Sequence, residues 1–100
     1  MAVEFEWDAA KAKANLQKHG VAFDEALTVF ADPLARVFDD PDHSVDETRE
    51  LVIGQSARNR VLVVCFIERD GRVRIINARR ATTRERSNHE ENTKAPNDHS

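Results

Sequence analysis

The sequence has little cysteine, glycine or proline: one Cys, three Gly and three Pro among 100 residues. The lone cysteine, Cys65, excludes an intramolecular disulfide and a cysteine-based zinc site. No apolar run approaches the roughly 20 residues of a membrane span, and no basic start followed by an apolar stretch opens the chain. We therefore expect one small cytoplasmic domain with no membrane contact, stabilised by packing or by a partner.

The net charge of −3 hides an uneven distribution along the chain. Residues 1–48 carry 4 basic and 11 acidic side chains, residues 49–86 carry 10 and 4, and residues 87–100 carry 1 and 3. All ten basic residues of the middle segment are arginines, whose planar guanidinium groups suit bidentate recognition of phosphate. The middle segment therefore favours a phosphate-rich ligand, although a set of solvated arginines fits the composition equally well.

The first third of the chain has the pattern of two helices. Asp8 is a typical N-cap, strong helix formers follow it, and Gly20 comes directly after them, which predicts a helix over residues 9–19. Apolar residues then recur at helical spacing over residues 21–30 until Pro33 ends the pattern. The two segments predict a helical hairpin.

The second half of the chain has the period of strands. We expect a short strand at residues 34–38 and longer strands over residues 48–53, 60–68 and 72–78, the last two joined by a tight turn at 69–71. The run from Val61 to Ile67 is apolar on both faces, which predicts a central strand with helices on one face and partial cover on the other.

Residues 82–85 form a capping box that opens a third helix, extending to about residue 91 and nearly devoid of an apolar face. We expect residues 92–100 to be a disordered polar tail. The elements predict an α+β fold, in which two N-terminal helices pack on a small, mainly antiparallel β-sheet and a short C-terminal helix follows. Residues 1–91 would form a single domain.

Several templates for ligand sites are missing from the sequence. It has no Gly-rich phosphate loop, no pair of Cys or His residues at metal-ligand spacing, and no serine in a nucleophile elbow. The acidic loop at residues 39–47 lacks the glycine of a calcium loop. We expect neither a metal ion nor a cofactor.

The best candidate anion site is the junction at residues 79–83. Arg79 and Arg80 come just before the capped helix, whose free N–H groups and positive dipole end favour a bound phosphate. Strict alternation on the last strand would place Arg79 on the face of Val73 and Ile75, opposite the face of Arg80.

Cleavage of RNA through its 2′-hydroxyl needs a base, an acid and cations that stabilise the developing charge, and it requires no metal. The candidate cations are Arg49, Arg79 and Arg80, and the candidate acid–base groups are His19, Glu47 and His89. Two of the acid–base groups have a structural alternative: His19 would be a cation at a helix C-terminus, and Glu47 would form a surface ion pair with Arg49.

Short motifs from residue 5 to residue 82 carry a family resemblance. They are Phe5-Glu6-Trp7-Asp8, Lys11, Asn15, Lys18-His19-Gly20-Val21, Phe30-x-Asp32-Pro33, Asp42-His43-Ser44, Glu47-x-Arg49, Ile53-Gly54-x-Ser56 and Arg74-Ile75-Ile76-x-Ala78-Arg79-x-Ala81-Thr82. In this order they resemble the BrnT family of bacterial type II toxins over roughly residues 3–91.

The resemblance implies a RelE-like fold and an endoribonuclease that stops translation. It also implies that a BrnA-like antitoxin of ribbon-helix-helix type neutralises the toxin. Operator DNA would be contacted only by the antitoxin. Transferred motif by motif, the catalytic positions are Lys11, His19, Glu47, Arg49 and Arg79, and the RNA-binding positions are Arg74, Arg80, Thr82 and His89. The family commonly has a tyrosine where this chain has His89, and the match does not assign which residue is the base and which the acid.

A rival hypothesis belongs to another class of protein. The third helix has almost no apolar face, and one face of the sheet lacks full cover, so both surfaces would be completed by another chain. In this reading the protein is a non-catalytic module that pairs with a DNA-binding partner and tunes its repression.

Overall fold

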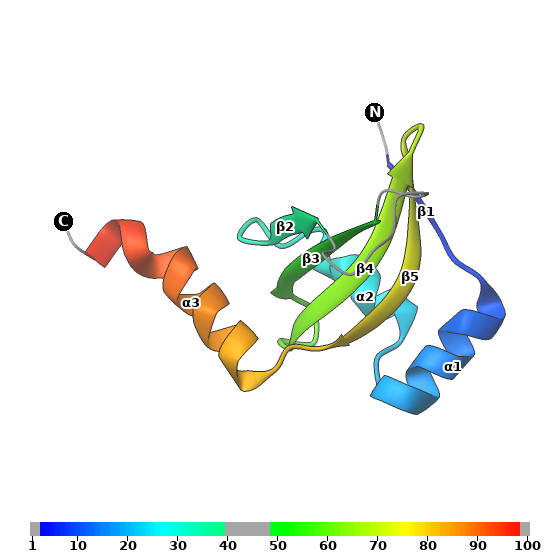
Figure 1. Ribbon diagram of the computed structural model, residues 1–100, viewed down its shortest axis with the longest axis horizontal. Helices are drawn as coiled ribbons and strands as arrows, with labels where there is room; N and C mark the ends of the chain where they lie inside the picture. The colour runs from blue at the N-terminus through cyan, green and yellow to red at the C-terminus, as the bar shows by residue number, and fades with distance from the viewer. Residues whose placement is uncertain (1–2, 40–48, 99–100) are drawn as a thin grey trace.

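The computed structural model describes residues 3–39 and 49–98, with side chains as far as residue 91. Within these ranges the fold is α+β, with three helices and a five-stranded mixed sheet (Figure 1). The elements are β1 (Glu4–Glu6), α1 (Ala9–His19), α2 (Phe23–Val29), β2 (Arg36–Asp39), β3 (Arg49–Gln55), β4 (Val61–Arg69), β5 (Arg72–Arg80) and α3 (Thr83–Asp98). The strand order is β1-β5-β4-β3-β2; β1 runs parallel to β5, and the other neighbours are antiparallel.

Helix α1 forms where its caps predict. The Asp8 carboxylate accepts hydrogen bonds from the backbone N–H groups of Lys11 and Ala10, at 3.2 and 2.8 Å, and these bonds lower the pKa of Asp8. Gly20 ends the helix in the left-handed conformation, with φ of 70°, and donates its N–H to the Leu16 carbonyl. Both ends are therefore fixed by local chemistry.

The predicted turn between the last two strands is confirmed as a two-residue hairpin. Arg69 pairs with Arg72, and the intervening Asp70 and Gly71 both have positive φ, 57° and 80°. That combination is typical of a type I′ turn, which matches the twist of the flanking strands.

At the other end of the chain, α3 runs to Asp98, beyond the predicted end near residue 91.

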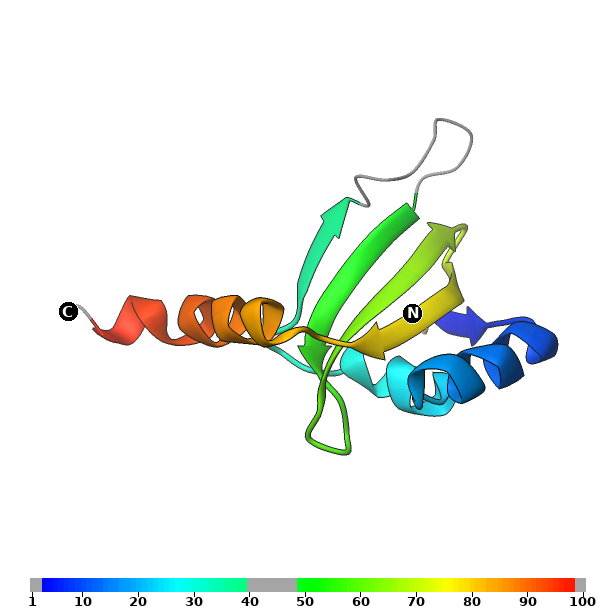
Figure 2. The same cartoon turned by 60° about the horizontal axis from the view of Figure 1, so that its bottom comes forward.

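The hydrophobic core lies between α2 and one face of the sheet, which we call the helix face. Phe23, Ala26 and Val29 of α2 pack there against the sheet. The sheet residues of this core are Val52, Leu62, Val64, Phe66, Val73, Ile75 and Ala78. Figure 2 shows α1 and α2 on the same side of the sheet, while α3 leaves from the end of β5. The opposite face, which carries Leu51 and Cys65, is called the second face.

A β-bulge corrects the predicted faces of β5. Cys65 pairs with Asn77 but Phe66 pairs with Ile75, so Ile76 is an extra residue and the alternation shifts by one. Val73 and Ile75 therefore lie on the helix face while Arg79 lies on the second face, so the prediction that they share a face was wrong. The bulge also puts Arg72 and Arg74 on the same face as Arg79. It thereby aligns three arginines of one strand.

Asn15 attaches α1 to the edge of β5. Its side-chain amide donates to the carbonyls of Val21 and Ala78, at 3.0 and 2.8 Å, and its Oδ1 accepts the Ala78 N–H at 3.1 Å. Because β1 pairs with β5 only as far as Arg74, Ala78 lies on an edge without a neighbouring strand. The buried Asn15 therefore forms the hydrogen bonds to the Ala78 backbone that a neighbouring strand would otherwise form.

Candidate functional site

The second face of the sheet is basic at both ends and apolar between them. Cross-strand partners share a face, so one row runs from Arg49 through Ile67 and Arg74 to Glu6. The middle rows carry Leu51 opposite Cys65, and Ile53 opposite Val63. Arg79 lies at the other end, opposite Val63.

Arg79 is held by a carboxylate from the first turn of α3. Its two terminal nitrogens donate to the two oxygens of Glu85, at 2.8 and 2.9 Å. The pair raises the pKa of Arg79 and lowers that of Glu85 to about 2; the Arg79 hydrogen bonds are the main cause, and the Thr82 N–H adds to the effect on Glu85. The Arg79 guanidinium is therefore fixed in place with its charge compensated.

The same carboxylate occupies the predicted anion site. The Thr82 N–H donates to Glu85 Oε1 at 2.8 Å, and the Glu85 N–H donates to Thr82 Oγ1 at 3.1 Å. These bonds form the predicted capping box and use two of the N–H groups at the start of α3. Glu85 thus supplies the negative charge at the helix start, and a bound phosphate would have to share Arg79 with it.

His89, one helical turn after Glu85, lies against the second face. It is 7% exposed, and it lines a pocket of about 170 Å³ together with Phe38, Leu51 and Ile53. Its Nδ1 is buried and has no hydrogen-bond partner in the described part of the chain. A buried nitrogen without a partner costs about 1–3 kcal/mol, so the imidazole would gain from a group that supplied one.

Lys11 and His19 lie on α1, beside the outer edge of β5. They line a hollow with Lys18, Ile76 and Asn77. Asn77 belongs to the second face, two residues before Arg79. The hollow therefore borders the second face near Arg79 from the side opposite α3.

Arg49 and Arg74 occupy the far end of the second face. Both are opposite Ile67 of β4, whereas Arg79 is opposite Val63. Four residues of β4 separate these rows, about 13 Å along the strand. Arg74 donates to Glu6 at 3.3 Å and is half exposed. The sheet register thus separates Arg49 from Arg79 and joins it with Arg74.

The remaining predicted positions are dispersed. Arg80 lies opposite Leu62, at the end of the helix face, and lines a polar hollow with Arg86 and Glu90. Thr82 is exposed and serves as the N-cap of α3. Glu47 lies outside the described residues.

The structure brings three residues to this region that sequence reasoning did not select: Glu85, Asn77 and Arg72. Glu85 was interpreted only as part of a capping box, and nothing in the sequence indicated that it would hold Arg79 as well. Asn77 lies opposite Cys65 on the second face and lines the hollow of Lys11 and His19, so it joins α1 to that face. The bulge at Ile76 brings Arg72 to the same face. Among the described residues, no three His, Cys, Asp or Glu side chains lie where they could hold a metal ion. Within the same residues, no helix has the length and apolarity needed to cross a membrane.

Comparison with known proteins shows similarity to a protein family and to a solved structure. The family model described as ribonuclease toxin, BrnT, of type II toxin-antitoxin system matches residues 7–85. A crystal structure of the Brucella abortus ribonuclease toxin BrnT is similar in fold, with a TM-score of 0.63 and 22% sequence identity over 82% of this chain and 100% of that one. No curated protein matches the chain.

Proposed function

The chain belongs to the BrnT family of ribonuclease toxins of type II toxin-antitoxin systems, and we propose that it cleaves RNA on the second face of its sheet without a metal ion. The observation that carries this proposal is the alignment of Arg72, Arg74 and Arg79 on that face, between groups of α1 and α3. An RNA strand laid along β5 would meet guanidinium groups spaced along its phosphates.

The proposed chemistry is attack of the ribose 2′-hydroxyl on the adjacent phosphate. A base removes the 2′-hydroxyl proton, the 2′-oxygen bonds to phosphorus, and the 5′-oxygen leaves with a proton from an acid. The products then end in a 2′,3′-cyclic phosphate and a 5′-hydroxyl. Such a reaction needs cations for the developing negative charge, and arginine provides them without a metal.

In this proposal each described position has a role that follows from where it lies, and Glu47 keeps the catalytic role that the family resemblance implies. Arg79 stabilises the phosphate, and Glu85 positions its guanidinium. His19 and Lys11 act from the α1 side and His89 from the α3 side. The outlying positions bind flanking nucleotides or complete the site; they are Arg49, Arg74, Arg80 and Thr82.

The wider expectations of the family belong to the same proposal. We expect the fold to be RelE-like, the cleaved RNA to be one that translation needs, and the protein to act in the cytoplasm. A BrnA-like antitoxin of ribbon-helix-helix type would neutralise it and would alone contact operator DNA. The family description supports the presence of an antitoxin, and the basic middle segment supports an RNA substrate.

A second candidate function is favoured by one contact. The Glu85 carboxylate compensates the charge of Arg79, so the strongest candidate cation is already neutralised in the free chain. A chain in that state suits the non-catalytic module that pairs with a DNA-binding partner. The two functions differ in whether RNA is cleaved when the partner is absent.

The experiment compares cleavage of a single-stranded RNA by four purified forms of the chain: wild type, Arg79→Ala, Arg74→Ala and Arg58→Ala. Arg58 is an exposed arginine in the β3–β4 turn and serves as the matched control. We expect Arg79→Ala to lower the rate at least 100-fold and Arg74→Ala to weaken RNA binding, whereas Arg58→Ala matches the wild type. Equal rates for Arg79→Ala and Arg58→Ala would refute the assignment of Arg79.

If the wild type does not cleave RNA, adding ribosomes separates a ribosome-dependent nuclease from the binding module. Cleavage that appears only with ribosomes keeps the ribonuclease function. Intact RNA under both conditions supports the non-catalytic candidate.

A further inference from the structure

Strand β2 is an edge strand whose apolar side chains face solvent on both sides. It is last in the strand order, and all four of its residues are exposed. Val37 is 54% exposed and Phe38 is 50% exposed. Adjacent strand residues point to opposite faces, so Val37 belongs to the helix face and Phe38 to the second face.

The opposite edge of the sheet is protected. β1 carries Glu4 and Glu6 on either side of Phe5, and exposed charges of this kind discourage pairing with another strand. Beyond β1, the side chain of Asn15 binds both backbone groups of Ala78. β2 also carries a charge at each end, Arg36 and Asp39, but between them it exposes two successive apolar side chains, one on each face. This apolar centre makes β2 the better edge for an added strand.

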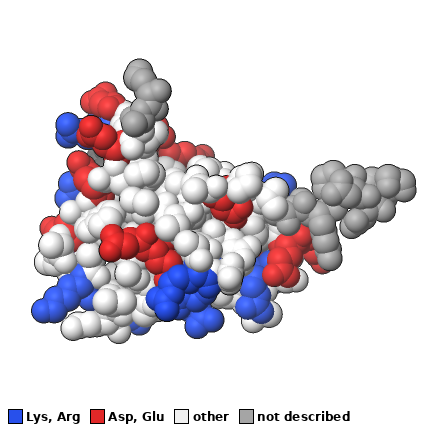
Figure 3. Space-filling model, turned by 180° about the vertical axis from the view of Figure 1, so that it is seen from behind, with Lys and Arg blue, Asp and Glu red and all other residues white. Residues whose placement is uncertain are grey.

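Apolar pockets lie on both faces next to β2. On the helix face, Val37 lines a broad hollow with Leu27 and Phe30. Figure 3, which looks onto the side of the molecule that bears α2, shows a broad uncharged area there. On the second face, Phe38 lines the smaller pocket with Leu51. A strand paired with β2 would direct alternate side chains toward these two pockets.

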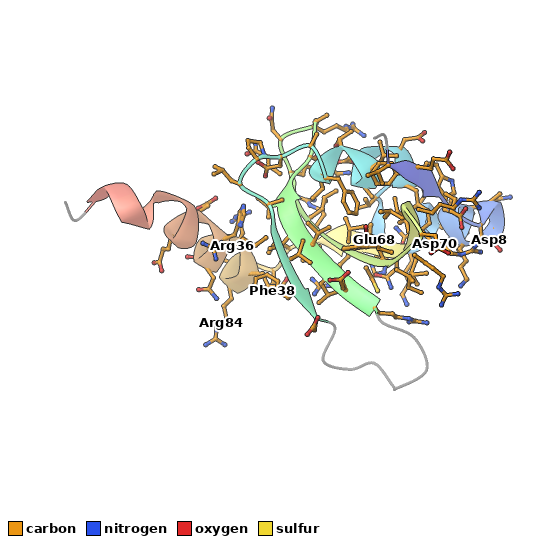
Figure 4. All side chains as sticks on the ribbon, turned by 90° about the horizontal axis from the view of Figure 1, so that it is seen from above. Asp8, Arg36, Phe38, Glu68, Asp70 and Arg84 are labelled. Carbon is orange, nitrogen blue, oxygen red and sulfur yellow. The ribbon has the colours of Figure 1, made fainter. Side chains whose placement is uncertain are left out.

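Helix α3 projects past the same edge. In Figures 1 and 2 it leaves the end of β5 and extends beyond β2, away from α1. Its 16 residues span about 24 Å, whereas an added strand needs only about 4.8 Å of width. The helix is therefore long enough to lie alongside a strand added next to β2. Figure 4 shows Arg36, Phe38 and Arg84 at this end of the molecule, with Glu68 and Asp70 at the far side of the sheet.

From these observations we infer that β2 receives an extended segment of the antitoxin as a sixth strand of the sheet. The segment has apolar side chains at successive positions, for the pockets of Val37 and Phe38, and acidic residues toward Arg36 and Arg84. The choice of occupant rests on the proposed function, since an antitoxin is the partner that the family implies. The added strand would lie beside the pocket of His89, which places the neutralising contact next to the proposed RNA site.

The test measures binding of the chain to the purified antitoxin from the same operon. Val37→Lys puts a charge into the proposed interface but lies on the helix face, away from the arginines of β5. Leu16→Lys is the matched control, because Leu16 is an equally exposed apolar residue on α1. We expect Val37→Lys to weaken binding at least tenfold and Leu16→Lys to leave it unchanged. Circular dichroism and thermal melts of both variants verify that they fold.

Hydrogen exchange of the complex identifies the mode of binding. A sixth strand should protect the backbone amides of β2 at least tenfold, since it supplies hydrogen bonds to that edge. Phe38→Lys, a second variant, should weaken binding as Val37→Lys does. Unchanged affinity for both variants would overturn the inference, and so would unprotected β2 amides in the complex.

Two further outcomes have defined meanings. The first is that a second copy of this chain occupies the edge, with Val37 opposite Val37 of the other copy. Light scattering would then show a dimer for the free wild-type chain and a monomer for the Val37→Lys variant, and this result would overturn the antitoxin as occupant. Ribonuclease activity of free Val37→Lys is expected to equal that of the wild type. If the proposed function is wrong, neither the wild type nor Val37→Lys cleaves RNA. The effect of Val37→Lys on antitoxin binding can still be interpreted in that case.

Discussion

Replacing Asn15 with alanine should destabilise the fold far more than any change at its exposed neighbours. The substitution removes three buried hydrogen bonds and leaves the Ala78 N–H, the Ala78 carbonyl and the Val21 carbonyl without partners. Each buried group without a partner costs about 1–3 kcal/mol, and water entering the gap recovers part of that cost. We expect a loss of about 3 kcal/mol, a large part of the roughly 5–15 kcal/mol that stabilises a typical domain.

Urea unfolding followed by tryptophan fluorescence measures this loss. Trp7 is the only tryptophan, and its ring contacts Phe23 of the core edge-on, with centroids 5.9 Å apart. A loss of about 3 kcal/mol would lower the urea midpoint by about 1–3 M. The control is Leu16→Ala. Leu16 follows Asn15 in α1 but is half exposed, so its substitution should change the free energy of unfolding by less than about 0.5 kcal/mol. A loss below about 1 kcal/mol for Asn15→Ala would refute the role of Asn15 as a substitute strand at this edge.

Two further predictions concern pH and packing. The pKa of Glu85 is held at about 2, below the ordinary glutamate value of 4.5, so its ion pair with Arg79 stabilises the fold fully above pH 4.5 and is lost as the pH falls toward 2. Glu85→Gln should therefore flatten the decline in unfolding free energy between pH 4.5 and 2. Gly54→Ala would put a Cβ 2.9 Å from the Cβ of Ala35, so thermal melts should show a loss of about 1–3 kcal/mol. An unchanged melting temperature would show that β3 packs less tightly against the segment before β2 than described.

The parts of the fold that were predicted have local causes. The Asp8 cap and Gly20 define α1, and the Asp70-Gly71 pair defines the β4–β5 hairpin, because each needs only neighbouring residues. β1 was not predicted, since three residues that pair with a strand about 68 positions later leave no periodic pattern of their own. The bulge at Ile76 likewise left no local signal, and it reversed the predicted faces of β5.

The candidate site could be predicted only in part, for a related reason. The arginines were selected by residue type, but which of them lie together depends on the register of three strands. That register joins Arg49 with Arg74 and separates both from Arg79. The sequence also showed that Glu85 caps α3, yet its pairing with Arg79 depends on how the helix leaves the strand.

The most direct test of the ribonuclease proposal is to incubate the purified, antitoxin-free chain with single-stranded RNA in EDTA and to analyse the product ends. Cleavage that yields 2′,3′-cyclic phosphate and 5′-hydroxyl ends, and that is lost in Arg79→Ala, is the predicted result. Cleavage that EDTA abolishes, or products with 5′-phosphate ends, would contradict the metal-independent attack of the 2′-hydroxyl on the second face.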